Sequence, residues 1–423
     1  MQERLKIVIF DGSFNTTTFI NRLAKGLSKN HKVYILGFNN TLANKLPKVN
    51  YVALGSSQKT VNLLLQSKLI AVKKLFKTGD LLSFFKTLKN IVSLNKKQLQ
   101  HDNFNNALQL INPNIVHVQW PSLLSWCEEG LQKGKYRFVL SQRGYQSNVR
   151  PFVDKENFGY LQKWYPKFAG FHSVSKAISL EGDKIYTPLS STSTSSAQRL
   201  KGGIQKIDKV VYSGFDFKAL HFLNNYQKGN TLRILSVGRP HWIKGYSDVL
   251  QACYILKGKG VNFRYTIVGV TEINEELLYL INDFGLQEHI TLLPKMTQEE
   301  VYTLMQESSV LLFPSIMEGL PNVVVESMAL GLPVISTKCG GVEELLDVNT
   351  GWLVPTRNTK ALAEAIIHFT ETPDAQIEEI RLAARKKVED QHSVEQMVNG
   401  MEGLYLEVIA GISDTPQVPS RGH

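Results

Sequence analysis

Short apolar runs, ended by proline, glycine or polar residues, alternate along this chain with longer stretches whose apolar residues recur at helical spacing. Residues 310–313 form such a run, ended by Pro314, and are predicted to be a buried strand. A helix is predicted over residues 321–330, with a proline in its first turn and Gly331 as its stop, followed by a strand over residues 332–336. This order is typical of a parallel sheet, which binds ligands at the carboxyl ends of its strands.

The same alternation opens the chain, where predicted strands at residues 6–10 and 32–38 enclose a predicted helix at residues 17–27. Gly12 lies in the first turn of this βαβ unit, either in a plain tight turn or in a phosphate-binding loop. A chain of 423 residues exceeds what one hydrophobic core usually serves. We therefore expect an α/β fold with two doubly wound domains.

The composition is that of an ordinary globular protein, with 43% hydrophobic and 20% charged residues. No apolar run is long enough to span a bilayer, and the first residues lack the cleavage region of a signal peptide. Three scattered cysteines favour a reducing compartment and argue against a zinc site or a disulfide framework. These features predict a cytoplasmic protein that binds no metal.

Charge is distributed unevenly along the chain. Residues 1–223 carry 32 Lys and Arg against 12 Asp and Glu, a net charge of +20, whereas residues 224–423 carry 16 against 25, a net charge of −9. This asymmetry supports two domains and indicates an anionic partner for the first. We do not expect nucleic acid, because no zinc-finger, RRM or helix-turn-helix pattern accompanies the charge. An anionic membrane surface is the other candidate.

Within the basic half, residues 68–98 combine apolar residues at helical spacing with eight lysines. One interpretation is a basic amphipathic helix in the interface of an anionic membrane, where each lysine contributes roughly 1 kcal/mol. This interpretation places the protein at the inner face of the membrane. The other is an ordinary surface helix that packs its apolar side on the sheet. The pattern leaves both open.

Two carboxylates mark the stretch from residue 310 to residue 336. Glu318 falls in the predicted loop and Glu326 on the predicted helix, which is otherwise apolar. An isolated glutamate on a helix usually faces solvent. Gly319, however, permits close approach to the backbone, and the helix start offers N–H groups and a positive dipole end that suit a phosphate.

The ordered motif resembles the signature of the family 4 retaining glycosyltransferases, which have the two-domain GT-B fold. Its parts are an E-G-x-P segment with a second glutamate, a G-x-P-V-I strand and a G-G-x-x-E loop. In this chain they are Glu318-Gly319-Leu320-Pro321 with Glu326, Gly331-Leu332-Pro333-Val334-Ile335 and Gly340-Gly341-Val342-Glu343-Glu344. A further match is the V-G-R-x-x-x-x-K-G loop at residues 237–245, which carries Arg239 and Lys244.

The resemblance implies a nucleotide-sugar donor held mainly by the second domain. Glu318 would contact a hydroxyl of the transferred sugar and Glu326 the ribose hydroxyls. Arg239 and Lys244 would hold the diphosphate, because fixed cations stabilise its growing charge without a metal. The remaining donor-binding residues implied are backbone and small positions: Gly12, Gly238, Gly319, Leu320, Pro321 and Asn322.

In the first half, residues 113–120 resemble the family strand P-D-x-V-H-x-H, with Asn114 and Gln119 as departures. His117 is either a structural histidine or a contact of the acceptor. Arg143 stands where family members commonly place a histidine near the reacting centre. An arginine stays protonated and cannot act as a general base, but it could bind phosphate or an anionic acceptor.

These observations predict two Rossmann-like domains that face a cleft. The first covers residues 1–223 and is joined by the last helix, at about 393–410. The second covers residues 224–392, and residues 411–423 are predicted to be a disordered tail.

The predicted function is transfer of a sugar from a nucleotide-sugar donor to a glycan or lipid-linked acceptor, with retention at the anomeric carbon. The resemblance places this reaction in the assembly of cell-surface polysaccharide or lipopolysaccharide, and it requires no cofactor. The alternatives are a catalytically inactive sugar-nucleotide-binding protein and another enzyme of the same fold, such as a sugar-nucleotide epimerase or a glycosidase. A glycosidase would need two carboxyl groups roughly 5–9.5 Å apart but no cationic loop at residues 239–244.

Overall fold

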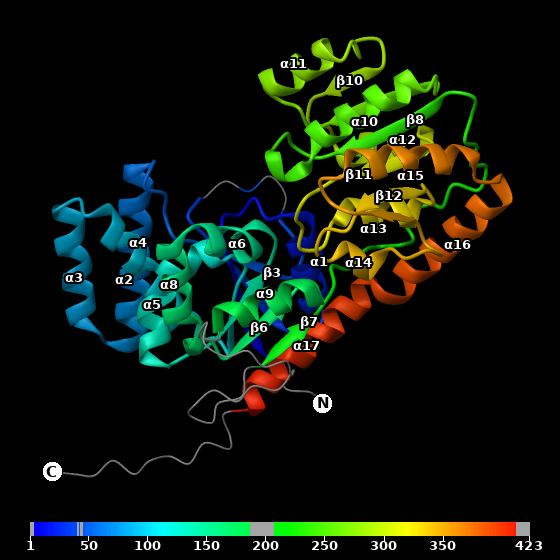
Figure 1. Cartoon of the computed structure of the whole chain (residues 1–423). Coiled ribbons are helices and arrows are strands. Elements are labelled where there is room, and N and C mark those ends of the chain that lie inside the picture. Colours follow the sequence, from blue (N-terminus) through cyan, green and yellow to red (C-terminus); the bar gives the residue numbers. More distant parts are fainter. Residues whose placement is uncertain (1–3, 40–41, 43–44, 187–206, 412–423) are drawn as a thin grey trace. The chain divides into compact units, whose positions relative to one another are not determined.

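The computed structural model describes residues 4–39, 42, 45–186 and 207–411, and it divides into two compact units (Figure 1). Unit 1 comprises the chain up to Val174, residues 179–214 and the chain from Val394 onward, and unit 2 comprises residues 175–178 and 215–393. The tail predicted for residues 411–423 lies outside the described residues, apart from Gly411.

The change of unit comes at Phe215, earlier than the predicted boundary after residue 223. The Phe215 side chain and the Leu220 side chain are buried in the core of unit 2. The Phe215 N–H also donates to the His392 carbonyl oxygen, within the same unit. The segment 215–223 therefore belongs to unit 2.

Unit 1 contains, in its described part, a seven-stranded parallel sheet in the order β3-β2-β1-β4-β5-β6-β7. Its strands are β1 (Lys6–Gly12), β2 (Lys32–Gly37), β3 (Val49–Ala53), β4 (Ile115–Val118), β5 (Arg137–Gln142), β6 (Gly170–Ser173) and β7 (Asp208–Val210). The helices that accompany it are α1 (Thr18–Leu27), α2 (Thr60–Thr78), α3 (Leu81–Val92), α4 (Lys96–Ile111), α5 (Leu124–Lys133), α6 (Tyr145–Asn148), α7 (Arg150–Val153), α8 (Lys155–Trp164), α9 (Lys176–Tyr186) and α17 (Val394–Ala410).

Apolar cores cover both faces of this sheet, as expected for parallel strands. Val8 and Phe10 belong to one buried cluster, and the alternate residues Ile7 and Ile9 belong to another. The second cluster also includes buried residues of α17, the last helix of the chain: Met397, Val398, Met401, Leu404, Tyr405 and Val408. Helix α17 packs against α1, β6 and β7 and is therefore part of unit 1.

Unit 2 contains a six-stranded parallel sheet in the order β10-β9-β8-β11-β12-β13, counted over the residues that the structure describes. Its strands are β8 (Leu232–Val237), β9 (Phe263–Val268), β10 (Ile290–Leu293), β11 (Val310–Phe313), β12 (Val334–Thr337) and β13 (Trp352–Val354). Its helices are α10 (Tyr246–Gly258), α11 (Glu275–Asp283), α12 (Gln298–Glu307), α13 (Asn322–Leu330), α14 (Val342–Leu345), α15 (Thr359–Glu371) and α16 (Asp374–Gln391).

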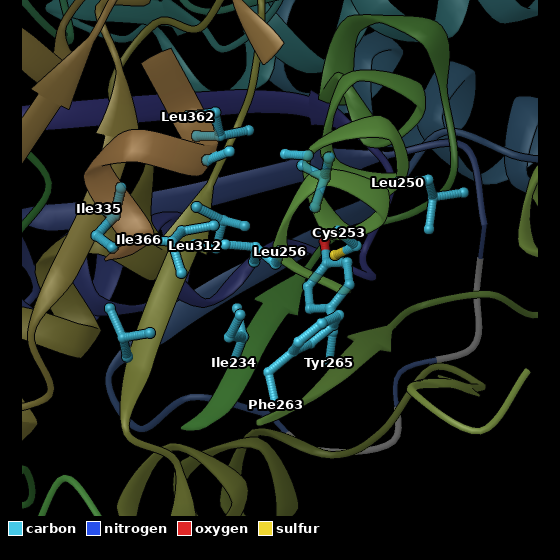
Figure 2. Close-up of a cluster of buried hydrophobic side chains, with 14 of the residues drawn as sticks. Ile234, Leu250, Cys253, Leu256, Phe263, Tyr265, Leu312, Ile335, Leu362 and Ile366 are labelled. Carbon is cyan, nitrogen blue, oxygen red and sulfur yellow. The ribbon is translucent and has the colours of Figure 1, made fainter. Parts of the chain in front are cut away.

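Figure 2 shows the core on one face of the second sheet. Leu250, Cys253 and Leu256 of α10 lie over the strands that carry Ile234 and Leu312. The next residues along those strands turn to the opposite face, where the core contains buried side chains of α13. Sheets covered on both faces expose chiefly their strand ends, so the carboxyl ends are where polar chemistry can gather.

Each sheet has one point at which successive strands leave in opposite directions. In unit 1, β1 lies between β2 and β4, and in unit 2, β8 lies between β9 and β11. Ligands of open parallel sheets bind outside the carboxyl ends of the strands at such a switch point. A ligand is therefore expected at the loops that follow β1 and β4 in unit 1, and β8 and β11 in unit 2.

The prediction of one helix over residues 68–98 is wrong. Helix α2 ends at Gly79, whose φ of +70° is the left-handed conformation that often ends a helix. Asp80 then caps α3 by accepting a hydrogen bond from the Ser83 N–H, and Asn95 caps α4 in the same way. The segment is thus divided among three helices, α2, α3 and α4.

Candidate functional site

Two loops at the switch point of unit 2 hold most of the predicted donor-site residues. The loop after β8 runs through Gly238 and Arg239 to Lys244, the last residue of a short 3-10 helix (Trp242–Lys244). The loop after β11 carries Glu318 and leads into α13. Because β8 and β11 are neighbouring parallel strands, both loops leave the same edge of the sheet.

Lys244 and Glu318, which are far apart in sequence, form an ion pair between these loops. The Lys244 Nζ lies 2.7 Å from the Glu318 Oε1, and the two side chains are 21% and 19% exposed. The Ser315 hydroxyl donates to the same carboxylate oxygen over 3.1 Å. The Lys244 Nζ also lies 5.2 Å from the centre of the Phe313 ring. The structure therefore fixes one cation and one carboxylate side by side at this edge of the sheet, both partly exposed.

Glycines allow the backbone around Glu318 to pack closely. A Cβ on Gly340 would lie 2.2 Å from the Glu318 carbonyl oxygen, and a Cβ on Gly341 would lie 2.1 Å from that of Gly319. The Gly341 N–H donates to the Gly319 carbonyl oxygen over 3.1 Å. This contact explains why the chain has a glycine pair here, and it fixes the loop that carries Glu318.

The loop after β8 is held in a similar manner. The Gly238 N–H donates to the Val268 carbonyl oxygen over 2.8 Å, and its carbonyl oxygen accepts from the Tyr246 hydroxyl over 2.8 Å. The Arg239 side chain is exposed and forms no hydrogen bond or ion pair within the described part of the chain. Its guanidinium is therefore available to a ligand at this edge.

Helix α13 begins at Asn322, one residue later than predicted, with Pro321 as the residue before it. No side chain caps this end among the residues that the structure describes. The N–H groups and dipole of such a helix start suit an anion. Leu320 and Asn322 are half-buried beside it, so this end of the helix is partly accessible.

Glu326 does not face open solvent, although an isolated glutamate usually does. It accepts hydrogen bonds from the Gln298 Nε2 over 2.8 Å and from the Tyr302 hydroxyl over 3.1 Å, both on α12. Gln298 and Tyr302 could not be selected from sequence reasoning, because a whole strand, β11, separates them from Glu326. These contacts orient the Glu326 carboxylate.

The switch point of unit 1 gathers a second polar group. Asp11 and Gly12 end β1, and Trp120 and Arg143 follow the neighbouring strands β4 and β5. The Trp120 indole N–H donates to Asp11. Burial raises the pKa of Asp11 to about 6, against the opposing effects of the Trp120 hydrogen bond and the Arg143 charge. Gly12 has a φ of +75°, which only a glycine adopts easily.

Arg143 is 8% exposed, and its guanidinium carbon lies 4.1 Å from the centre of the Phe19 ring. One guanidinium nitrogen donates to the Gln119 Oε1 over 3.4 Å. The Arg143 Nε and the Gln119 Nε2 find no hydrogen-bond partner among the described residues. Burial lowers the pKa of Arg143 to about 9, so it remains a cation at neutral pH. Two unused donors beside a buried cation suit an anionic group.

His117 lies in the core of unit 1 and is completely buried. Its ring nitrogens are 2.8 Å from the Tyr405 hydroxyl and 2.8 Å from the Ser141 hydroxyl. Burial, with the charge of His172 and Arg143, lowers the pKa of His117 well below its usual range. This position favours the structural interpretation of His117 over an acceptor contact.

No group of three or more His, Cys, Asp or Glu side chains is arranged to hold a metal ion in the described ranges. The three cysteines are free and buried, one in unit 1 and two in unit 2.

Comparison with known protein families finds a match within unit 2. Residues 222–387 match the family described as Glycosyl transferases group 1. The amylovoran biosynthesis glycosyltransferase AmsK of Erwinia amylovora is 38% identical over 37% of this chain and 40% of its own length. The capsular polysaccharide biosynthesis glycosyltransferase CapM of Staphylococcus aureus is 26% identical over 49% of this chain and 57% of its own. The chain spans about half the length of the curated relatives it matches.

Solved structures resemble the whole chain. Sucrose-phosphate synthase from Thermosynechococcus elongatus has a TM-score of 0.72 and 14% identity, and covers 96% of this chain and 100% of its own. Anabaena HepE, solved in complex with UDP and glucose, has a TM-score of 0.66 and 16% identity, and covers 95% of this chain and 99% of its own. The fold is GT-B. The matched GT-B domain lies in unit 2 and includes the Lys244–Glu318 pair.

Proposed function

We propose that this GT-B protein is a glycosyltransferase, which moves a sugar from a nucleotide-sugar donor to a glycan or lipid-linked acceptor in the assembly of a cell-surface polysaccharide. The observation that carries the proposal is the Lys244–Glu318 ion pair at the switch point of unit 2, inside the segment that matches Glycosyl transferases group 1. The names of the relatives AmsK and CapM support polysaccharide assembly.

In this proposal the diphosphate of the donor binds between Lys244, Arg239 and the start of α13. All three groups are positive, and Lys244 and the start of α13 follow the neighbouring strands β8 and β11. Positive groups aimed at the leaving diphosphate stabilise the charge that grows as its bond to the sugar breaks, and one such group is worth about 3 kcal/mol. The proposal therefore needs no metal ion for the diphosphate.

Glu318 and Glu326 are proposed to accept hydrogen bonds from hydroxyls of the donor. Glu318, beside Lys244, would contact the sugar, and Glu326, oriented by Gln298 and Tyr302, the ribose. The acceptor oxygen would attack the anomeric carbon from the side of the leaving group while the bond to the diphosphate breaks. A diphosphate oxygen would take the proton of the acceptor hydroxyl, so configuration is retained without a protein nucleophile.

On unit 1 we propose that Arg143 binds an anionic group of the acceptor. Its buried charge and the unused donors of Arg143 and Gln119 support this assignment. A carboxylate or a phosphate could accept hydrogen bonds from both donors, the Arg143 Nε and the Gln119 Nε2. Gly12, at the end of β1, remains a predicted donor contact.

The proposal is tested with UDP-, GDP- and ADP-sugars, by thermal shift and by release of nucleotide. One nucleotide class should stabilise the wild type, and Lys244→Ala and Glu326→Ala should lose that stabilisation. Lys244→Ala should also reduce donor hydrolysis by roughly 100-fold, because a fixed cation at the leaving group is lost. Arg143→Gln should retain donor hydrolysis and lose transfer to an anionic acceptor.

Lys259→Ala and Glu288→Ala are matched controls, since both side chains are exposed on unit 2 away from the two loops. If no nucleotide-sugar shifts the melting of the wild type at millimolar concentration, the transferase proposal fails. Binding without release or transfer in any donor–acceptor combination would instead identify a catalytically inactive sugar-nucleotide-binding protein.

A further inference from the structure

Helix α2 presents an apolar stripe away from the body of unit 1. At about 100° per residue, positions 61, 65, 69, 72 and 76 fall within an arc of roughly 80°. All five are apolar, and all but the half-buried Val72 are exposed, Phe76 to 87%. Soluble surfaces seldom carry a continuous stripe of this kind unless it binds something.

Helix α3 continues this apolar surface. It packs beside α2, and Figure 1 shows α2, α3 and α4 side by side. Its exposed apolar residues include Leu82, which is 86% exposed, and Phe85 and Val92. We call the exposed apolar residues of the two helices the hairpin face: Val61, Leu65, Leu69, Phe76, Leu81, Leu82, Phe85 and Val92.

The buried contacts among α2, α3 and α4 include polar groups beside apolar ones such as Leu63 and Ile70. The buried Lys74 Nζ lies 2.9 Å from the Asp80 carboxylate, and it donates to the Ser83 hydroxyl and the Asn106 side chain. The buried Asn103 Nδ2 donates to the Ser67 hydroxyl over 2.9 Å. The large apolar side chains of the hairpin face are thus exposed although polar groups occupy part of the interior, which indicates that this face meets an apolar medium.

Lysines surround the hairpin face. Residues 59–97 contain nine lysines and one acidic residue, Asp80, which is paired with the buried Lys74. Lys68 and Lys73 border the stripe of α2, and Lys89 lies within the face of α3. Across residues 45–186 and the other described ranges, these three side chains form no hydrogen bond or ion pair. Their charges are therefore available to an anionic partner.

We infer that the hairpin face docks unit 1 on the surface of an anionic lipid bilayer, with Phe76, Leu82 and Phe85 in the acyl boundary and the lysines at the headgroups. Such a surface offers both an apolar layer and negative charge, which a basic amphipathic helix requires. The helices lie on the bilayer, since no helix in the described residues is long and apolar enough to cross it. This inference uses no residue of the donor site and does not rest on the transferase proposal.

The test is flotation of the full-length protein with vesicles of phosphatidylcholine alone and of phosphatidylcholine with phosphatidylglycerol in equal parts. The wild type should bind the anionic vesicles at least about tenfold more tightly, and added salt should weaken this binding. We expect this binding to be lost in the double variant Phe76→Ser/Phe85→Ser, because the apolar contact with the bilayer is removed. We also expect it to be lost in the triple variant Lys68→Gln/Lys73→Gln/Lys89→Gln, because three positive charges are removed while the aromatic residues stay.

Matched controls come from other surfaces of the chain. Ile273→Ser/Val348→Ser replaces apolar residues that are 84% and 86% exposed on unit 2, and Lys25→Gln/Lys29→Gln removes exposed lysines of unit 1. Both should bind anionic vesicles as the wild type does. Equal binding of wild type and serine variant, or binding that ignores lipid charge, would overturn the inference. A wild-type dimer that the serine variant converts to a monomer, without change in flotation, would show that a second copy covers the face.

Discussion

Because Lys244 and Glu318 form an ion pair, replacing either residue also changes the electrostatic environment of the other. Both side chains are about one-fifth exposed, so removing the ammonium leaves a carboxylate with little hydration. In the proposed site that carboxylate would then face the donor diphosphate, and like charges would repel. The loss expected for Lys244→Ala thus combines a missing cation with an unmasked anion.

Asp11 should make the stability of unit 1 depend on pH. Burial raises the pKa of Asp11 from 3.8 to about 6, so the folded state binds more protons than the unfolded state between these values. Stability therefore falls as pH rises through this window, by up to about 3 kcal/mol. Asp11→Asn keeps an oxygen that can accept from Trp120 but cannot ionise. We expect the variant to unfold at a higher temperature than the wild type at about pH 8.

The measurement is thermal unfolding of both proteins at about pH 4.5 and about pH 8, followed by circular dichroism and by Trp fluorescence. The advantage of Asp11→Asn should shrink towards the lower pH, where the wild-type carboxyl is protonated. A difference that stays constant across the range would show that the substitution acts through packing, and that Asp11 does not titrate near 6.

At the scale of elements, the contact between the Gly340–Gly341 turn and the Glu318 loop sets the position of the proposed sugar contact. Gly341 has a φ of −66°, which any residue adopts, so only space excludes a side chain. A Cβ there would lie 2.1 Å from the Gly319 carbonyl oxygen and 2.9 Å from the Ser175 Cβ. Because backbone cannot move aside as a side chain can, the loop itself must shift.

Gly341→Ala should therefore destabilise the protein by about 1–3 kcal/mol through overpacking. It should also reduce donor hydrolysis by up to about 100-fold, since small displacements of a positioning group are costly. The control is Gly258→Ala at the end of α10, where nothing lies within 4 Å of an added Cβ. The control should match or exceed wild-type stability. Equal activity of the two variants would show that the Glu318 loop tolerates displacement.

The sequence was sufficient for elements whose signal is local. The run at 310–313 is β11, the glycine at 331 ends α13, and the fold class is confirmed. The E-G-x-P motif and the 237–245 loop were separate matches in sequence, and the parallel pairing of β8 and β11 brings Lys244 to Glu318.

Features that depend on packing could not be predicted. The break at Gly79 depends on a left-handed glycine that the apolar periodicity hides. The partners of Glu326 lie on α12, and the polar contacts around Lys74 arise only when α2, α3 and α4 pack together. The burial of His117 likewise follows from α17, which covers it from the other end of the chain.

At the scale of the whole molecule, α17 shows that order in the chain does not determine membership of a unit. Its Leu404 and Met401 are completely buried in the same cluster as Ile7 and Ile9, although about 400 residues separate them in sequence. The Gly26 position in α1 has no room for a Cβ, which would lie 2.3 Å from the Val398 side chain. The core of unit 1 is therefore complete only when α17 has packed against α1.

We therefore predict that a substitution of a buried residue in α17 destabilises β1 and α1, at the other end of the chain. Leu404→Ala leaves a cavity in the core of unit 1 and should cost about 2–5 kcal/mol. Hydrogen exchange should then accelerate in β1 and α1 and stay unchanged in β8 and β9. Leu256→Ala, at an equally buried position of α10 in unit 2, is the matched reverse case and should accelerate exchange in β8 and β9. If both variants loosened both sheets equally, the two units would unfold as one body, and α17 would stabilise the whole chain rather than unit 1.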